Sequence, residues 1–212
     1  GKEIKMEPRN IQPGREMSKD ADKLLRRIGA GALEELTCNV MPWWIKNMPD
    51  RDGDGFYGRI DGRENVVSDA PRGAILNARI LWSFAAAYLR QREPLYLKMA
   101  TRARDYIFRY FFDDLHGGTY WSLKSNGEPL ETKKQIYSQA FFIYALSAYH
   151  AATGDRESLE RAITLFRLIE KHSFDRERDG YFEAFTREWG ELADLRLSEK
   201  DANEKKTMNT HL

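Results

Sequence analysis

Apolar residues recur at helical spacing in several stretches of this sequence, which predicts a protein built mainly of α-helices. The most apolar stretch is Pro71–Arg90, where large apolar side chains occur on most sides of the predicted helix. A helix that is apolar around most of its circumference is buried within a fold. We therefore expect this helix to be central. Further helices are predicted at residues 18–41, 94–112, 136–153 and 155–172.

The start of the chain differs from the rest in its pattern. Residues 1–17 are polar and show no periodicity, so we predict a disordered extension. Ser18 or Asp20 is a suitable N-cap for the first helix, and Pro42 is expected to end or bend it. Met17 stands directly before this helix, and we expect it to be the natural first residue.

Three turn-rich stretches each contain a corner, which we define as a glycine followed closely by aromatic residues. The corner glycines are Gly55, Gly118 and Gly180, which lie 63 and 62 residues apart. Each corner follows an acidic residue, and two predicted helices lie between successive corners. The sequence therefore predicts an internal repeat of helix, helix and hairpin, in which neighbouring repeats bury each other.

The corner regions carry the turn and strand signals. Residues 113–130 are predicted to form a β-hairpin with Asn126-Gly127 at its turn, and residues 175–185 are also hairpin-like. Residues 50–62 contain aspartates and glycines, as a calcium-binding loop does. However, the fixed spacing and late glutamate of such a loop are missing, so a turn-rich segment is the better interpretation.

Helix pairs that stack around an axis form either an open solenoid or a closed α/α toroid. The helices at 71–90 and 136–153 are the more apolar and are predicted to form an inner ring. Their partners at 94–112 and 155–172 carry more charge and are predicted to form an outer ring. We therefore predict an all-α protein, an (α/α)6 barrel with short β-hairpins between helix pairs. Residues 18–212 supply only about half of the ring.

Composition excludes several classes of function. The 34 basic and 33 acidic residues leave a net charge of +1, which does not attract nucleic acid or an anionic membrane. The single cysteine, Cys38, excludes an intrachain disulfide and fits a reducing, cytoplasmic location. No signal peptide is predicted from the polar start of the sequence, and no apolar run approaches the roughly 20 residues of a membrane span. No pair of histidines has metal-ligand spacing, so no metal site is predicted.

Polar residues recur near the start of each predicted inner helix. They are Arg79, Tyr137, Gln139, Asn209 and His211. A buried guanidinium is costly unless it is paired, so Arg79 is expected to close an ion pair or to line a polar cavity. In a toroid these positions converge around the axis at one mouth, where a small polar ligand would bind.

Several motifs, in this order and spacing, carry a resemblance to a known family. They are Asn77-Ala-Arg-Ile-Leu-Trp, His116-Gly-Gly-Thr-Tyr-Trp, Tyr137-Ser-Gln-Ala-Phe, Gly180-Tyr-Phe-Glu, Ser198-Glu-Lys-Asp-Ala and Met208-Asn-Thr-His-Leu. Together they resemble the N-terminal half of the cellobiose 2-epimerases, in the N-acylglucosamine 2-epimerase superfamily. That superfamily has an (α/α)6-barrel fold.

The resemblance implies a cofactor-free isomerase whose partner is a small sugar, a β-1,4-linked disaccharide such as cellobiose. The reducing-end glucose opens, a histidine removes the C2 proton, and a cis-enediolate forms. The C2–C3 bond then rotates, and a second histidine returns a proton to the other face. Histidine titrates near neutral pH, which suits it to this proton transfer, and a guanidinium suits the developing oxyanion.

Carried over residue by residue, the resemblance gives Arg79 the catalytic role of steadying the enediolate. It gives Tyr137, Asn209 and Asp201 substrate-binding roles. His211 matches the first histidine of the family motif Asn-Thr-His-Leu-His, whose role is less clear. The second histidine of that motif and the two proton-transfer histidines fall outside this sequence. The resemblance therefore implies that this chain alone is an incomplete fragment.

Other functions remain open on the sequence. An N-acylglucosamine 2-epimerase or an aldose–ketose isomerase would use the same barrel. A toroid glycosidase would need paired carboxylates, for which Asp50, Asp54, Asp114 and Glu183 are available. A non-catalytic, sugar-binding half-toroid that closes by dimerising is a further alternative. The sequence does not predict an oligomeric state.

Overall fold

The computed structural model describes residues 19–211, so the whole of the predicted 1–17 extension, together with residue 18, lies outside the described residues. The chain divides into two compact units, residues 1–46 and residues 47–212. None of the helices in residues 19–211 combines the length and the apolar character needed to cross a membrane.

The described residues of the first unit, 19–46, are helical. Helix α1 (Lys19–Glu35) continues through a π-helical turn, η1 (Leu36–Val40), into α2 (Met41–Asn47). Of the two expectations for Pro42, that it ends or that it bends the helix, the first is wrong because the helix continues to Asn47. The backbone N–H of Met41 donates to the carbonyl of Leu36, five residues earlier, so the helix widens just before the proline. This wider turn accommodates a residue that has no N–H to donate.

The second unit contains the predicted helix pairs. Its helices are α3 (Ala74–Gln91), α4 (Pro94–Tyr106) with its π-helical extension η2 (Ile107–Phe111), α5 (Ile136–Thr153), α6 (Arg156–His172) and the short α7 (Met208–His211). The predicted limits of the helices from α3 to α6, with η2 as the end of the second, are confirmed to within about three residues at each end.

Local sequence explains where these helices begin and end. Asp155 caps α6, because its carboxylate accepts from the backbone N–H of Ser158 at 3.1 Å. Pro94 is the first residue of α4, where its missing N–H costs nothing. Gly154 ends α5 with φ of +78°, a left-handed conformation that glycine adopts without strain.

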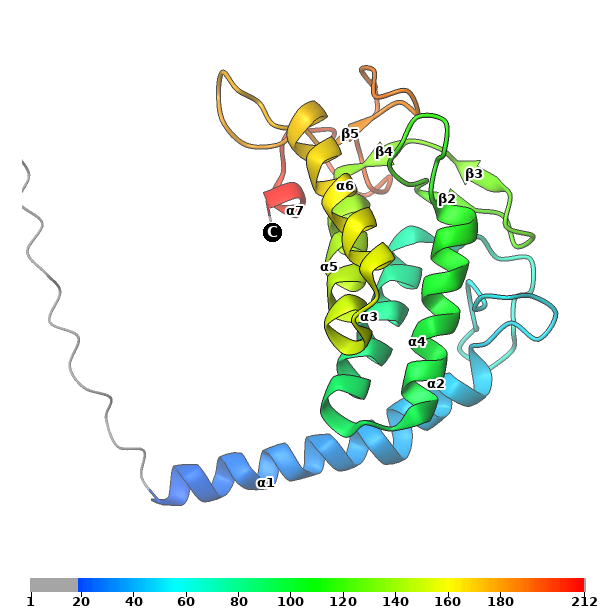
Figure 1. The fold of residues 1–212 in the computed structure, drawn as a ribbon, viewed down its shortest axis with the longest axis vertical. Coiled ribbons are helices and arrows are strands. Elements are labelled where there is room, and N and C mark those ends of the chain that lie inside the picture. Colours follow the sequence, from blue (N-terminus) through cyan, green and yellow to red (C-terminus); the bar gives the residue numbers. More distant parts are fainter. Residues whose placement is uncertain (1–18, 212) are drawn as a thin grey trace, which may run out of the picture. The chain divides into compact units, whose positions relative to one another are not determined.

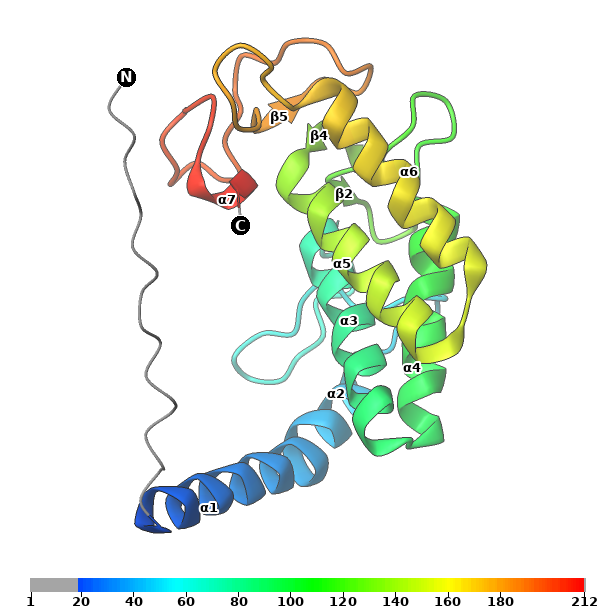
Figure 2. The same cartoon turned by 60° about the vertical axis from the view of Figure 1, so that its left-hand side comes forward.

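The helices form two layers. Helix α3 packs beside α5, α4 packs against α3, and α6 packs against α5. Figures 1 and 2 show α4 and α6 on the same side of the α3–α5 layer. Small and large apolar side chains fill the layers, and six of those that are fully buried are Ala78, Leu81, Ala85, Phe142, Ala145 and Leu146. The predicted division into inner and outer helices agrees with this packing.

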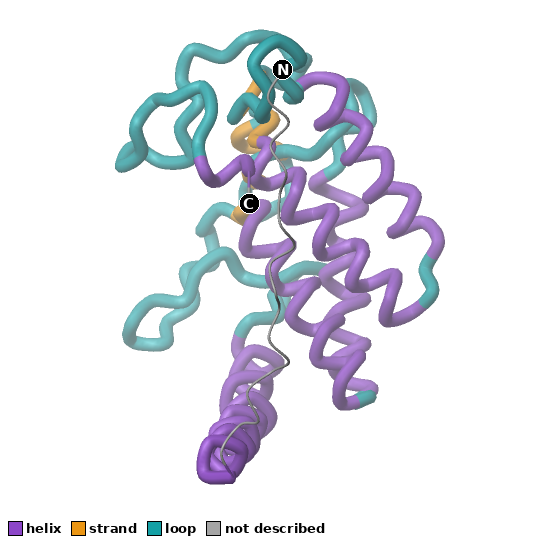
Figure 3. Tube along the Cα trace, turned by 90° about the vertical axis from the view of Figure 1, so that its left-hand side faces the viewer, coloured by secondary structure: helices purple, strands orange, loops and turns teal. Residues whose placement is uncertain are grey.

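Short strands connect the repeats, and Figure 3 shows how little of the chain they occupy. The strands are β1 (Arg72–Gly73), β2 (Ser122–Leu123), β3 (Pro129–Glu131), β4 (Lys134–Gln135) and β5 (Ala184–Phe185). Strand β2 pairs antiparallel with β1 and with β3, and β4 pairs antiparallel with β5. The β1–β2 and β4–β5 pairs each join the strand before an inner helix to the corner of the next repeat.

The hairpin predictions have different outcomes. The hairpin at residues 113–130 is confirmed, with Gly127 at φ of +89° in its turn. The hairpin predicted at residues 175–185 is reduced to one bridge between Phe174 and Tyr181. Its second strand, β5, pairs instead with β4 of the preceding repeat, because the neighbouring repeat offers a free strand edge.

Candidate active site

Backbone hydrogen bonds between repeats fix where the inner helices α3 and α5 begin. The backbone N–H of Ala74, the first residue of α3, donates to the carbonyl of Trp121 at 3.0 Å. In the same way, the backbone N–H of Ile136, the first residue of α5, donates to the backbone carbonyl of Glu183 at 2.9 Å. Trp121 and Glu183 each lie three residues after a corner glycine. Helices α3 and α5 therefore each begin against the corner of the next repeat.

The starting points of the inner helices determine where the predicted site residues lie. Tyr137 is the second residue of α5, and Asn209 is the second residue of α7. Arg79 is the sixth residue of α3, about one helical turn further from the helix start. The three residues therefore occupy the first two turns of successive inner helices.

Arg79 and Tyr137 are brought together by one aromatic ring. The guanidinium carbon of Arg79 lies 5.1 Å from the ring centroid of Phe141, in a cation–π arrangement. The ring of Tyr137 meets the same Phe141 ring edge-on, with centroids 4.9 Å apart. One apolar side chain therefore supports both predicted residues.

The expectation that Arg79 is buried is wrong, because its side chain is exposed. Trp82, on the same helix, is 36% exposed and stacks on Tyr144 of α5, which is 54% exposed. The apolar pattern of α3 indicates which side chains are suited to burial, but it does not show which of them are covered. Among residues 19–211, part of the face formed by α3 and α5 is left exposed.

Asn209 and Asp201 form a second group. Together with Glu183 they line a cavity of about 10 Å³, which is close to the volume that one water molecule occupies. Glu183 is only 2% exposed, and its carboxylate accepts from the backbone N–H of Thr207 at 2.6 Å and from the hydroxyl of Thr210. Glu183 therefore holds the first turn of α7, which carries Asn209.

Asp201 is exposed and is engaged in its own turn. Its carboxylate accepts from both the backbone N–H and the hydroxyl of Ser198, each at 2.9 Å. Asp201 lies in a long segment without regular structure. That segment is nevertheless anchored, because the amide of Gln135 donates to the carbonyl of Arg196 at 2.9 Å and Lys133 donates to the same oxygen at 3.0 Å.

Gln139, which recurs at the same part of the repeat, has a structural role. It is fully buried, and its amide exchanges two hydrogen bonds of 3.0 Å with the backbone N–H and C=O of Thr119. Both ends of the side chain are therefore occupied within the second corner, and Gln139 is not available to a ligand.

Each corner contains an ion pair that the sequence analysis missed. An aspartate five residues before the corner glycine pairs with a cation two residues before the next inner helix. The pairs are Asp50–Arg72 at 2.6 Å, Asp113–Lys134 at 2.8 Å and Asp175–Lys206 at 2.6 Å. Each cation also lies over the aromatic ring two residues after the glycine, namely Tyr57, Tyr120 and Phe182, at 5.1–5.6 Å. Aligning the repeats on their glycines reveals the acidic residue of each pair.

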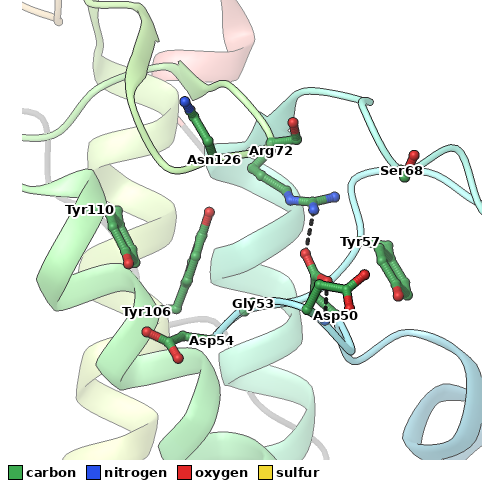
Figure 4. Close-up of a pocket in the computed structure, with 12 residues that line it drawn as sticks. Asp50, Gly53, Asp54, Tyr57, Ser68, Arg72, Tyr106, Tyr110 and Asn126 are labelled. Atoms are coloured by element: carbon green, nitrogen blue, oxygen red, sulfur yellow. Dashed lines mark hydrogen bonds and ion pairs between the residues drawn. The ribbon is translucent and has the colours of Figure 1, made fainter.

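The buried arginine of the first repeat is therefore Arg72, at 2% exposed, and not Arg79. Figure 4 shows Arg72 directed at Asp50, beside Tyr106 and Tyr57. These residues line a pocket of about 410 Å³. The backbone around Asp50 is held by Arg102, which donates to the carbonyls of Asp50 and Gly55 at 2.6 and 2.9 Å.

In the second corner, two cations bond to one buried aspartate. Asp113 is fully buried and accepts from Lys134 at 2.8 Å and from Arg187 at 2.9 and 3.1 Å. Burial alone would raise the pKa of Asp113, but the hydrogen bonds and charges of Arg187 and Lys134 lower it well below its usual range. Arg187 comes from the segment after β5, so this aspartate ties that segment to the second corner.

Metal binding has no support in the part of the chain that the structure describes. Across residues 19–211, no group of three or more histidine, cysteine, aspartate or glutamate side chains is arranged to hold a metal ion. Asp50 is paired with Arg72, and Asp54 is paired with Arg109.

Comparison with known proteins relates this architecture to a protein family. Residues 55–202 match the family of N-acylglucosamine 2-epimerases (GlcNAc 2-epimerases). The chain is 56% identical over 179 residues to the cellobiose 2-epimerase of Bacteroides fragilis, a match that covers 84% of this chain and 46% of that protein. It is 39% identical to the cellobiose 2-epimerase of Eubacterium cellulosolvens, covering 84% and 44%.

Solved structures agree. The cellobiose 2-epimerase of Spirochaeta thermophila superposes with a TM-score of 0.84 at 37% identity, covering 92% of this chain and 48% of that one. A D-mannose isomerase, at a TM-score of 0.66 and 23% identity, shares the fold. The fold is thus part of an (α/α)6 barrel, as predicted, and the chain belongs to the N-acylglucosamine 2-epimerase family. It spans about half the length of these cellobiose 2-epimerases.

Proposed function

We propose that this chain supplies the N-terminal half of a sugar 2-epimerase. The proposed enzyme interconverts glucose and mannose configuration at C2 of the reducing-end residue of β-1,4-disaccharides such as cellobiose. Residues 18–212 form the proposed half-barrel, and the proposed location is cytoplasmic. The observation that carries the proposal is the exposed guanidinium of Arg79, supported on Phe141 beside Tyr137, in a chain 56% identical to a cellobiose 2-epimerase.

The proposed chemistry requires Arg79 to stabilise negative charge. Removal of the C2 proton places negative charge on the oxygens at C1 and C2, and a fixed cation that faces this charge lowers the barrier. A guanidinium presents a planar set of donors that can contact two neighbouring oxygens at once. The Phe141 ring beneath Arg79 restricts its orientation, which reduces the cost of reorganisation during the reaction.

Tyr137, Asn209 and Asp201 are the proposed sugar-binding residues. A phenol ring offers an apolar face and a hydroxyl, and the amide and carboxylate can bind sugar hydroxyl groups. Proton transfer at C2 is assigned to two histidines in a C-terminal half, as the family resemblance implies. The described residues contribute oxyanion stabilisation and binding.

The test uses the complete protein that contains this chain, with cellobiose as substrate in D2O. We expect deuterium at C2 and a product with mannose configuration at the reducing end. Arg79→Gln should lower kcat by about 100- to 1,000-fold, as loss of an oxyanion donor does. Arg90→Gln removes an equal charge from an exposed position on the same helix and is the matched control.

Product analysis separates the alternatives. A ketose product would indicate an aldose–ketose isomerase, and turnover of an N-acylated glucosamine alone would indicate an N-acylglucosamine 2-epimerase. Binding of cellobiose without deuterium at C2 would favour a non-catalytic half-toroid and would refute the proposal. A glycosidase has less support, since Asp50, Asp54 and Glu183 are each engaged separately in the corners.

A further inference from the structure

The fourth residue of each inner helix is polar. These residues are Asn77 in α3, Gln139 in α5 and His211 in α7. In the second and third repeats, the side chain at this position turns back to the preceding corner. There it accepts a hydrogen bond from the backbone N–H of the residue directly after the corner glycine.

The two contacts are equivalent in position and length. In the second repeat the N–H of Thr119 donates to Oε1 of Gln139 at 3.0 Å. In the third repeat the N–H of Tyr181 donates to Nε2 of His211, also at 3.0 Å. A ring nitrogen of the histidine therefore occupies the place of the glutamine amide oxygen.

The corner glycines show how closely these side chains approach the backbone. A Cβ built on Gly118 would lie 3.2 Å from Oε1 of Gln139, and one built on Gly180 would lie 2.6 Å from Nε2 of His211. Both glycines have positive φ, +75° and +82°. Glycine at each corner thus serves the backbone conformation and leaves room for the side chain that crosses it.

The second nitrogen of His211 determines its protonation state. Nδ1 lies 2.6 Å from the carbonyl oxygen of Thr207, which can only accept a hydrogen bond. Nδ1 must therefore carry a proton, whereas Nε2 must be free of one to accept from Tyr181. These two partners select the neutral imidazole with its proton on Nδ1.

We propose that His211 is a positioning residue, which clamps the first turn of α7 to the third corner as Gln139 clamps α5 to the second. Its Nε2 lone pair is committed to Tyr181, so His211 takes no part in proton transfer. The inference deepens the proposed function because α7 carries Asn209. Its structural content, namely the tautomer and the clamp, does not depend on any activity.

The first test is nitrogen-15 NMR of the histidine side chains in the 212-residue chain at neutral pH. We expect His211 to show a protonated Nδ1 and an unprotonated Nε2. The signal is assigned by its loss in His211→Gln, and the other three histidines serve as internal references. A proton on Nε2, or a doubly protonated ring, would overturn the assignment.

The second test compares His211→Gln with His211→Ala through amide hydrogen exchange at Tyr181. Alanine removes the acceptor and should speed exchange about tenfold or more, while glutamine should restore most of the protection. Unchanged protection in the alanine variant, or equal loss in both variants, would contradict the clamp.

In the complete protein, deuterium incorporation at C2 should survive in His211→Gln and fall in His211→Ala, mainly through a higher KM. Loss of incorporation in the glutamine variant with normal protection at Tyr181 would assign proton transfer to His211 and refute the proposal. If the wild-type protein has no epimerase activity, the proposed function fails, while the NMR and exchange results still decide the clamp.

Discussion

Asp113 lies in an environment that excludes water. Its carboxylate is fully buried, and two cations, Lys134 and Arg187, donate to it. Removal of one partner from a buried ion pair leaves the other charge without compensation. The second corner therefore depends strongly on this carboxylate, which holds Arg187 together with the hydroxyl of Tyr120, to which Arg187 donates at 3.0 Å.

Replacing Asp113 with asparagine should lower the free energy of unfolding by about 3–5 kcal/mol, measured by urea denaturation. Asp105→Asn is the control, because Asp105 is 58% exposed and its pair with Arg104 is at the surface. That variant should change stability by no more than about 1 kcal/mol. Equal losses in the two variants would show that burial does not set the strength of the Asp113 pair.

The same carboxylate gives stability a pH dependence. The pKa of Asp113 is lower in the folded chain than in the unfolded chain, so folding favours the charged form. The stabilisation is fully present above the unfolded pKa, about 4, and is lost as pH falls below that value. Asp113→Asn should lose this part of the acid sensitivity, and unfolding curves between neutral pH and about pH 3 test it.

Among the elements, the corners constrain the sequence more tightly than the helices do. Gly154 and Gly180 both have positive φ, +78° and +82°. A Cβ on Gly154 would meet no atom within 4 Å, whereas one on Gly180 would meet His211. Substitutions at the two glycines can therefore be compared. Both lose stability through the left-handed backbone conformation, but only a substitution at Gly180 also brings a Cβ too close to His211.

Gly154→Ala should cost about 1–2 kcal/mol of stability, which is the conformational penalty alone. Gly180→Ala should cost more, because the methyl group also displaces His211 from Tyr181. The double variant Gly180→Ala with His211→Ala should lose less than the sum of the two single variants, as measured in a double-mutant cycle. Additive losses would show that the methyl group and the imidazole do not compete.

Local signals account for what the sequence predicted well. The limits of α5 and α6 follow from Gly154, from Asp155 and from periodicity, all of which act within a few residues. The pairing of β4 with β5 was not predicted, because two-residue strands have no periodicity and their partners are about 50 residues apart. Glu183 was considered only as a candidate glycosidase carboxylate, since no local pattern indicates its bonds to Thr207 and Thr210.

The candidate site was predicted in part. The repeat phase pointed to Arg79 and Tyr137, and the structure joins them through Phe141. It also grouped Gln139 with them, although Gln139 is fully committed to Thr119. Spacing along a helix identifies a position, but it does not distinguish a side chain that faces a ligand from one that bonds to the backbone.

At the scale of the whole molecule, an uncovered aromatic surface has consequences for solution behaviour. Trp82 and Tyr144 stack on each other across α3 and α5, and Phe166 on α6 is 54% exposed. Exposed apolar groups of this size promote association between molecules. The isolated chain is therefore expected to be marginally stable or to self-associate.

Tyr144→Ser should reduce this association by removing the most exposed ring of the stacked pair, with little loss of stability. Light scattering across a concentration series is the measurement, and Tyr88→Ser, on the same layer of helices, is a comparison at a less exposed ring. A wild-type chain that is monomeric at all concentrations and unfolds in one sharp transition would contradict the expectation.

Hydrogen bonds join the starts of α3 and α5 to the following corner. They also limit how such a chain can change its length during evolution. Every repeat brings its own aspartate, cation and aromatic ring, and the starts of α3 and α5 are each bonded to the repeat that follows. A duplication or deletion of one whole repeat, about 60 codons long, keeps every such bond in register. An insertion of part of a repeat shifts a corner away from the helix start that it holds. Growth by whole units is therefore the permitted route, which makes a ring of nearly equal repeats the expected outcome of tandem gene duplication.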